Sequence, residues 1–326
     1  MEQIKKYQTT FLAYLANHPF KKEPLGLYEP VDYILNLGGK RMRPIALLMA
    51  YQVFKEDWEA ALPAAYAIEI FHNFTLVHDD VIDDAPLRRG KMTVHEKWDL
   101  NTSILSGDVM LVYAYEYLLA LENKVAISSI IKTFNKAAIE VCEGQQQDVD
   151  FELKAGVSIA EYLKMIELKT SVLLAAAMKI GALAAGSNES DAEHLYQFGR
   201  NIGIAFQLQD DYLDTFGDPA KFGKKVGGDI AKNKKTFLVL KALELADEPV
   251  KEELNRWMSN SDKDKETEKI NRITAIFHAL NIPALTKKMK NGFQDRAFQH
   301  LQAVSAEVQR KQALTQLAEM LLDREV

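Results

Sequence analysis

The chain has 326 residues, of which 48% are hydrophobic and 26% charged, with a formal net charge of −6. This composition is typical of a globular protein with a large core, and the acidic balance argues against bulk nucleic-acid binding. Because Cys142 is the only cysteine, an internal disulfide is excluded, and we expect a cytoplasmic protein with Cys142 as a small core residue. We expect no signal peptide, because charged and polar residues run through the N-terminal segment 1–20. We also expect no membrane span, because the most apolar run, 171–186, is short and interrupted by Lys179 and predicts a buried helix.

Helical periodicity runs through the whole chain, and no alternating strand series is present. The predicted helices span 2–17, 29–37, 41–54, 58–85, 103–123, 126–153, 158–185, 189–215, 234–246, 248–258, 266–279, 282–305 and 308–324. The pattern predicts an all-α protein, a multi-helix bundle around a central space. No linker is long enough to separate domains, so we expect a single domain over 1–326.

The first polar motif in chain order is GGKRMRP, which places Lys40, Arg41 and Arg43 where a predicted helix begins. Arginine forks and helix N-terminal amides both suit phosphate oxygens. Taken alone, the motif is equally compatible with a helix-initiating turn whose cations are solvated.

An acidic cluster ends the helix predicted over 58–85, in the sequence LVHDDVIDDAPLRRG. Asp79 and Asp83 are four residues apart and project from one face, with Asp80 and Asp84 in the neighbouring row. Like charges repel at this spacing, so the helix calls for a compensating cation. Carboxylates suit magnesium or calcium, and the absence of an EF-hand pattern favours magnesium.

A second acidic cluster, FQLQDDYLD at 206–214, repeats the spacing of the first with Asp210, Asp211 and Asp214. One such cluster is a weak signal, because acidic runs on solvated helices are common. Both clusters are embedded in apolar residues. If their helices face each other, the carboxylates would hold magnesium, and the magnesium would bind a diphosphate. Basic residues follow both clusters: Arg88 and Arg89 after the first, and Lys224, Lys225, Lys232, Lys234 and Lys235 after the second.

The chain also contains GQQQD at 144–148, KT at 169–170 and GKKVGGDI ahead of KKT. Together with the motifs described above, these resemble the motifs of the trans-isoprenyl diphosphate synthases, in the same order and over nearly the whole chain. The resemblance implies the all-α isoprenoid synthase fold, with a deep central cavity, in a homodimer. It also implies an enzyme that uses Mg2+ to join an allylic diphosphate (dimethylallyl, geranyl or farnesyl) to isopentenyl diphosphate, head to tail.

The resemblance further implies roles for individual residues. Magnesium ligands would be Asp79, Asp83 and Asp210, supported by Asp80, Asp211 and Asp214. Contacts to the allylic diphosphate would come from Arg88, Lys169, Lys224 and Lys234, with Lys235 as an alternative to Lys234. Isopentenyl diphosphate would bind Lys40, Arg43, His72 and Arg89. The oxygens of Thr170 and Gln207 would stabilise the carbocation, while Gln145 and Asp148 line the pocket and His78 is structural.

Product length is expected to depend on Phe74, five residues before Asp79 and about 7 Å along the helix. Its ring should block the growing chain after a few isoprene units, with Phe71 as a second obstruction. The small Thr75, and the absence of an insertion in the first acidic cluster, favour geranylgeranyl diphosphate over farnesyl diphosphate, which stays the alternative.

Two other functions are weighed against the synthase. A class I terpene cyclase would have no use for the isopentenyl-binding residues Lys40, Arg43 and His72. A noncatalytic partner subunit would be expected to lose acidic ligands, whereas this chain keeps both clusters.

Overall fold

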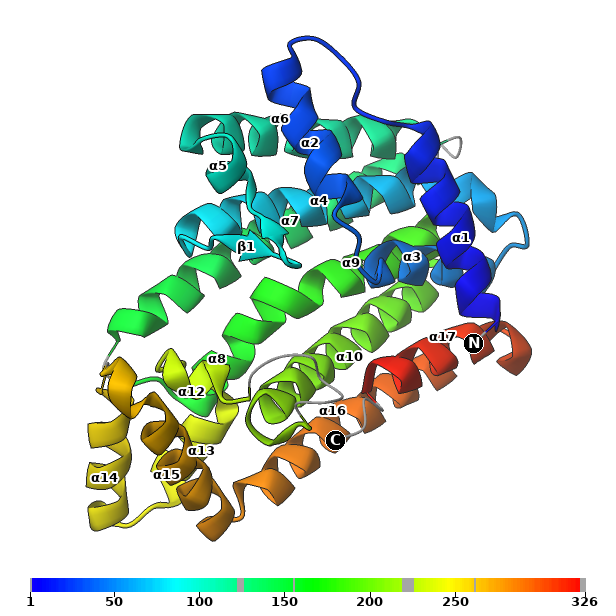
Figure 1. The fold of residues 1–326 in the computed structure, drawn as a ribbon. Coiled ribbons are helices and arrows are strands. Elements are labelled where there is room, and N and C mark those ends of the chain that lie inside the picture. Colours follow the sequence, from blue (N-terminus) through cyan, green and yellow to red (C-terminus); the bar gives the residue numbers. More distant parts are fainter. Residues whose placement is uncertain (1, 122–125, 155, 219–225, 261, 323–326) are drawn as a thin grey trace. The chain divides into compact units, whose positions relative to one another are not determined.

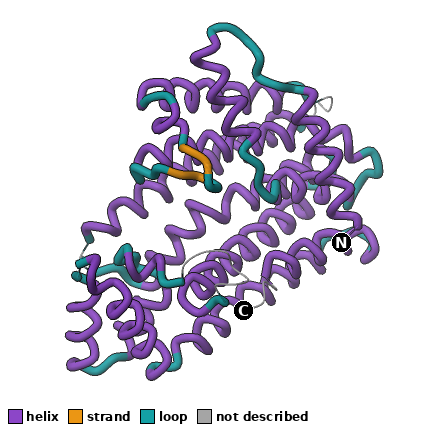
Figure 2. The backbone as a smooth tube through the Cα atoms, viewed as in Figure 1, coloured by secondary structure: helices purple, strands orange, loops and turns teal. Residues whose placement is uncertain are grey.

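The computed structural model describes residues 2–121, 126–154, 156–218, 226–260 and 262–322, and most of these residues are helical, as Figure 2 shows. The predicted all-α class is confirmed. The strands among the described residues form one short antiparallel hairpin of β1 (Leu87–Arg88) and β2 (Lys91–Met92). Two residues per strand are too few for an alternating pattern to be visible in a sequence.

The chain divides into two compact units. Unit 1 contains Met1–Ala138, Leu173–Gln197 and His300–Leu317, and unit 2 contains Ile139–Val172, Phe198–Gln299 and Ala318–Val326. The single domain over 1–326 therefore stays a prediction. Helices α7 (Ile127–Leu153), α9 (Val172–Ala184), α10 (Glu189–Phe216), α16 (Ile282–Ala303) and α17 (Val308–Leu322) each contribute residues to both units.

Unit 1 is built around helix α4. Its other elements are α1 (Glu2–Asn17), α2 (Leu25–Asn36), α3 (Met42–Gln52), the 3-10 helix η1 (Trp58–Ala61), α5 (Val94–Lys97) and α6 (Leu100–Leu119), with α4 itself spanning Leu62–Ile82. Helices α4 and α6 pack side by side in Figure 1, and α4 also packs against α3. Because Ala64, Ala65 and Ala67 are fully buried, neighbouring helices can approach α4 closely.

Among the described residues, the segment Trp58–Ile82 is the one helix long and apolar enough to cross a membrane by length and composition. Its most apolar window is 72% buried inside the protein. Such burial is what the central helix of a protein core shows, so the segment is weak evidence for a membrane span.

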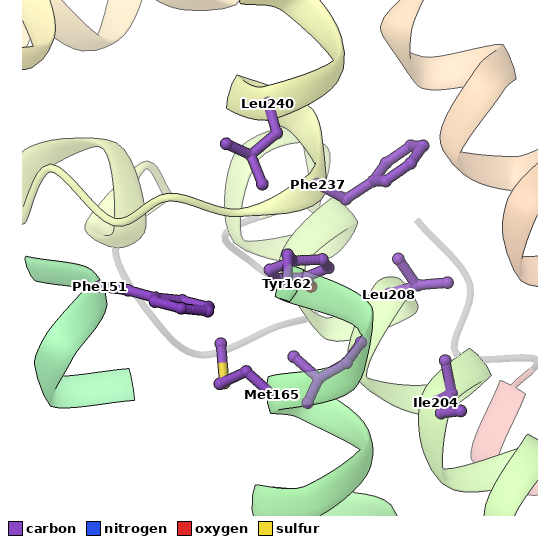
Figure 3. Packing of buried hydrophobic residues seen from close by; sticks show 8 residues of the cluster. Phe151, Tyr162, Met165, Ile204, Leu208, Phe237 and Leu240 are labelled. Atoms are coloured by element: carbon purple, nitrogen blue, oxygen red, sulfur yellow. The ribbon is translucent and has the colours of Figure 1, made fainter. Parts of the chain in front are cut away.

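Unit 2 contains α8 (Ile159–Ile166), the π-helical segment η2 (Glu167–Ser171), α12 (Gly228–Ala231), α13 (Phe237–Leu245), α14 (Glu248–Met258), η3 (Lys263–Lys265) and α15 (Glu266–Ala279). One apolar cluster surrounds Tyr162, with Phe151, Met165, Leu208 and Phe237 among its members, as Figure 3 shows. A second cluster joins α12, α13 and α15 through Ile230, Leu238, Ile273 and Phe277.

Most predicted helices are found within a few residues of their predicted ends, and the exceptions have physical causes. Helix α4 ends at Ile82 rather than at residue 85 because Asp84 adopts a left-handed backbone with φ +47°. Helix α13 begins at Phe237 rather than at residue 234, so Lys234 and Lys235 lie in the preceding turn.

The prediction for Cys142 was wrong. Its side chain is exposed, whereas Phe134, Ala137 and Val141 of the same helix are buried. Residues at this spacing share one helical face, and residue 142 lies off that face.

Candidate active site

The first acidic cluster is assembled with Arg88 at the end of α4. Asp80 is buried, Asp79 is partly buried and Asp83 is exposed. Arg88 donates Nε and Nη2 to the two carboxylate oxygens of Asp80, at 2.7 and 2.6 Å, and its Nη2 lies 3.6 Å from Asp79 Oδ2. A bidentate pair of this kind fixes the planar guanidinium in position. Unit 1 thus brings Arg88, an expected contact to the allylic diphosphate, together with the acidic cluster.

A cluster of cationic residues lies beside the same helix. Arg43, from the first turn of α3, has its Nη1 3.2 Å from His72 Nε2 on α4. Burial holds the pKa of His72 well below its ordinary value, and the positive charges of Arg43 and Arg89 lower it further. A neutral imidazole among guanidinium groups leaves a concentration of positive charge that suits an anion.

The glycine-rich turn before α3 contacts Arg89 of this cationic cluster. Gly38 and Gly39 have φ of +84° and +122°, a region that favours glycine. Arg89 donates to the carbonyl of Gly38, and a Cβ on Gly39 would lie 2.7 Å from the Arg89 guanidinium carbon. The structure therefore brings Arg43, His72 and Arg89 of the predicted set together; Lys40 lies exposed in the same turn.

Sequence reasoning missed a buried ion pair beneath this turn. Arg41, at the start of α3, is 4% exposed and pairs with Glu69 of α4, which is 2% exposed. Arg41 also donates to the carbonyl of Leu35, and Asn73 donates to Glu69. Arg41 therefore fixes the turn rather than facing a ligand. The available signal was an isolated glutamate, Glu69, inside an otherwise apolar helical run.

In unit 2, the aspartates of the second cluster differ in their surroundings. Asp211 is 3% exposed and accepts hydrogen bonds from Tyr162 and, at 2.9 Å, from Gln207 Nε2. Burial raises the pKa of Asp211 to about 6, while the positive charge of Lys234 opposes the rise. Asp214 accepts the backbone N–H of Asp229 at 2.8 Å. Tyr162 was missed because, in a sequence, it is indistinguishable from a core aromatic.

A small cavity of about 50 Å³ lies in unit 2, lined by Asp148, Tyr162, Met165, Ile166, Lys169, Thr170, Gln207, Asp211 and Lys234. Lys169 donates to Asp148 at 2.7 Å, and Thr170 Oγ1 lies 3.4 Å from Gln207 Oε1. Lys169 and Thr170 belong to η2, a π-helical segment that changes the helical register between α8 and α9. Six of the residues expected at the site line this cavity: Asp148, Lys169, Thr170, Gln207, Asp211 and Lys234. Gln145, which was also expected to line the pocket, does not line this cavity.

Known proteins resemble this chain over most of its length. The polyprenyl synthetase family model matches residues 25–277. A geranylgeranyl diphosphate synthase of Methanosarcina mazei is 44% identical over 68% of this chain and 68% of its own length. A short chain isoprenyl diphosphate synthase of Methanocaldococcus jannaschii is 42% identical over 74% of this chain and 73% of its own. The crystal structure of a geranylgeranyl pyrophosphate synthase has 44% identity and a TM-score of 0.94, covering 99% of both chains.

The chain belongs to the polyprenyl synthetase family. It is a prenyltransferase, with the all-α isoprenoid synthase fold. Polyprenyl synthetases are generally metal-dependent and use isopentenyl and allylic diphosphates. The carboxylates of Asp79 and Asp83 at the end of α4 are oxygen donors of the kind that a hard divalent cation prefers. Asp210 on α10 is a donor of the same kind.

For this polyprenyl synthetase, the structure distinguishes the two lysines that the sequence left as alternatives. Lys235 donates to the carbonyls of Phe151 and Lys154 at 2.5 and 2.6 Å, so it covers the C-terminal end of α7. Lys234 instead lines the cavity, with its Nζ 3.8 Å from Asp229. Burial disfavours its charge, but Asp211 and Asp229 outweigh that effect and raise the pKa of Lys234. Lys224 and Lys225 lie outside the described residues.

The aromatic residues expected to limit the product form one row on α4 of the synthetase. Phe71 and Phe74 have ring centroids 5.5 Å apart, and Phe74 meets the ring of His78 edge to face at 4.8 Å. Phe71 also packs edge to face against Phe134, at 5.1 Å. Thr75 donates its hydroxyl to the His72 carbonyl, so it adds little bulk beside Phe74.

Proposed function

We propose that this prenyltransferase condenses isopentenyl diphosphate head to tail with an allylic diphosphate, with residues 1–326 acting as one catalytic domain. The observation that carries the proposal lies in unit 1. His72, which Arg43 of α3 contacts and whose pKa Arg89 lowers, lies on the same helix as the first acidic cluster, two turns before Asp79. A synthase needs a second diphosphate site close to its ionisation site, and a cyclase does not.

Magnesium is the proposed cofactor, held by Asp79, Asp83 and Asp210. When bound, it supplies positive charge that stabilises the negative charge developing on the leaving diphosphate. A related geranylgeranyl pyrophosphate synthase from Corynebacterium glutamicum, 25% identical, was crystallised with isoprenyl diphosphate and magnesium. In this chain Asp80 accepts from Arg88, and Asp211 accepts from Tyr162 and Gln207, so these two aspartates orient their clusters.

The other residues bind and orient the two substrates. We assign Arg88, Lys169, Lys224 and Lys234 to the allylic diphosphate, because arginine forks and ammonium groups neutralise phosphate oxygens. Isopentenyl diphosphate is assigned to Lys40, Arg43, His72 and Arg89. The neutral His72 ring can donate one N–H to a phosphate oxygen while the arginines carry the charge.

The reaction needs no protein nucleophile. The bond between the allylic carbon and its diphosphate oxygen breaks, and the electron pair leaves with the diphosphate. The double bond of isopentenyl diphosphate then forms the new carbon–carbon bond, and the departing diphosphate accepts the proton that is lost. Thr170 and Gln207, 3.4 Å apart at the cavity, supply oxygen dipoles that stabilise the positive charge without reacting with it.

Geranylgeranyl diphosphate is the proposed product. The fully packed row of Phe71 and Phe74 supports an upper limit on product length. The names of the relatives from Methanosarcina mazei and Sulfolobus acidocaldarius, both geranylgeranyl diphosphate synthases, favour the twenty-carbon product over farnesyl diphosphate.

We further propose that the enzyme acts in the cytoplasm as a homodimer. Helix α6 supports the dimer, because Leu105, Val112 and Leu119 are more than half exposed and lie seven residues apart. Residues at this spacing share one helical face, and an apolar face of this kind is typical of an interface between copies.

The proposal is tested by supplying purified protein with isopentenyl diphosphate, magnesium and each allylic starter in turn. We expect consumption of isopentenyl diphosphate, a twenty-carbon product by mass spectrometry, and loss of turnover with EDTA. Asp79→Asn should lower kcat by about 100-fold or more. Asp84→Asn is the matched control, because Asp84 is exposed beside the cluster and asparagine tolerates its left-handed backbone.

Two results would contradict the proposal. Release of diphosphate with no use of isopentenyl diphosphate would identify a cyclase. No turnover by the purified chain, restored only by adding a second protein, would identify a partner subunit.

A further inference from the structure

Contacts on both sides of Lys234 hold it at the cavity. Lys234 lies in the turn between α12 and α13, where its backbone N–H donates to Asp229 O at 2.9 Å and its carbonyl accepts from Thr236 N at 3.0 Å. The preceding residue, Asn233, has a left-handed backbone with φ +59°. A non-glycine residue keeps that conformation only when its surroundings hold it.

A buried lysine on α15 holds this turn from one side. Lys269 is 2% exposed, and its Nζ donates to the side-chain oxygen of Asn233. The same Nζ donates to Asn260 O at 2.9 Å and to Ala231 O at 3.4 Å. Three acceptors match the three N–H groups of an ammonium, which offsets part of the cost of burying it.

Helix α15 is itself fixed against the residues that flank the turn. Gly227, with φ +86°, lies so close to Ile270 that a Cβ there would be 2.7 Å from the Ile270 side chain. Ile273 and Phe277 pack in the cluster that contains Ile230. Lys269 therefore projects from a rigid support, and its contacts act on Asn233 rather than on the cavity.

The other side of the turn is held by Lys235, whose Nζ donates to Phe151 O and Lys154 O. The residues before and after Lys234 are thus each tied to a different helix. Lys269 does not line the cavity, whereas Lys234 does. The two lysines accordingly have different tasks.

We propose that Lys269 is a positioning residue that holds Asn233 and thereby directs Lys234 to the diphosphate of the allylic substrate. The inference rests on the proposed function of Lys234. Removing the Lys269 ammonium would leave Asn233 without the contact that stabilises its backbone, and Lys234 would sample positions away from the cavity. Small displacements of a binding group reduce catalysis strongly.

A double-mutant cycle with Lys269→Met and Lys234→Met tests the proposal. Lys269→Met should lower kcat/KM for the allylic diphosphate by about tenfold or more, while KM for isopentenyl diphosphate stays within about twofold. In the Lys234→Met background, Lys269→Met should have less than about a twofold further effect, because both changes act through one group. Lys265→Met, an exposed lysine at the start of the same helix, is the matched control.

Asn233→Gly provides a second variant that does not depend on burying methionine. Glycine adopts the left-handed backbone but lacks the acceptor for Lys269. We expect it to lower kcat/KM for the allylic diphosphate and to show no further loss when combined with Lys269→Met. Thermal unfolding of each variant shows which variants remain folded. The kinetic comparison is made with the variants that do.

The possible results distinguish a failure of the positioning role of Lys269 from a failure of the proposed role of Lys234. Equal losses from Lys269→Met in both backgrounds, or equal losses for both substrates, would overturn the positioning role and leave Lys234 as a substrate contact. Unchanged activity of Lys234→Met would instead overturn the proposed role of Lys234, and the positioning role with it.

Discussion

Gly39 shows how a single residue shapes the proposed isopentenyl diphosphate site, through its close approach to Arg89. We predict that Gly39→Ala raises KM for isopentenyl diphosphate about tenfold or more, because a Cβ would displace the Arg89 guanidinium that lies 2.7 Å away. KM for the allylic substrate should change little. Steady-state kinetics with each substrate varied in turn measures the effect.

Gly38→Ala is the matched control for this prediction. Gly38 also has a positive φ, but nothing lies within 4 Å of its would-be Cβ. Both variants carry a backbone cost, because alanine is disfavoured at a positive φ, so equal kinetic effects would show that backbone strain, rather than Arg89, is responsible.

His72 predicts a dependence of stability on pH. Its pKa in the folded chain is held below the unfolded value, so the unfolded chain binds the proton more readily. Stability should therefore fall as pH drops below about 6.5. Urea unfolding of the wild type and of His72→Gln above and below this pH gives the difference. If the free energy of unfolding changes equally with pH in both proteins, groups other than His72 cause the effect.

At the residue scale, the spacing of the aspartates indicated that they form two acidic clusters, but it did not indicate which side chains each aspartate contacts. The two acidic clusters have the same spacing, yet Asp80 meets Arg88 whereas Asp211 meets Tyr162 and Gln207. Arg88 follows its cluster directly in the sequence. Tyr162 lies 49 residues from Asp211, so only the folded chain brings them together.

At the scale of elements, one row of α4 carries the proposed limit on product length. We predict that Phe74→Ala gives products longer than twenty carbons, because it removes the ring that meets Phe71 and His78. Chromatography of radiolabelled products measures the distribution. Leu62→Val is the control, since it trims a buried residue near the start of α4 on another face of the helix. An unchanged distribution for Phe74→Ala would refute the role of this ring.

The helices themselves were largely predictable, because apolar periodicity directly reflects which face of a helix is buried. The π-helical segment Glu167–Ser171 was not, although it carries Lys169 and Thr170. Apolar residues continue across it, so the sequence reads as one helix. Close packing coincides with the change of register: a Cβ on Gly144 would lie 2.3 Å from the backbone nitrogen of Lys169.

At the scale of the whole molecule, the exposed apolar face of α6 predicts how copies associate. Val112→Arg and Leu105→Arg, at residues 63% and 59% exposed, should convert the proposed dimer into monomers. Light scattering coupled to size-exclusion chromatography measures the mass. Leu12→Arg, at an exposed leucine of α1, should leave the mass unchanged. A dimer that persists in both α6 variants would place the interface elsewhere.

The sequence by itself determined the class of fold, the family and the chemistry of the acidic and basic clusters, since periodicity and charge spacing are local properties of a chain. Only the tertiary structure decided that Lys234 lines the cavity while Lys235 covers a helix end, and that Arg41 is buried against Glu69. These assignments depend on contacts between residues far apart in the chain. The spacing of residues along the chain does not predict such contacts, because they form only when the helices pack.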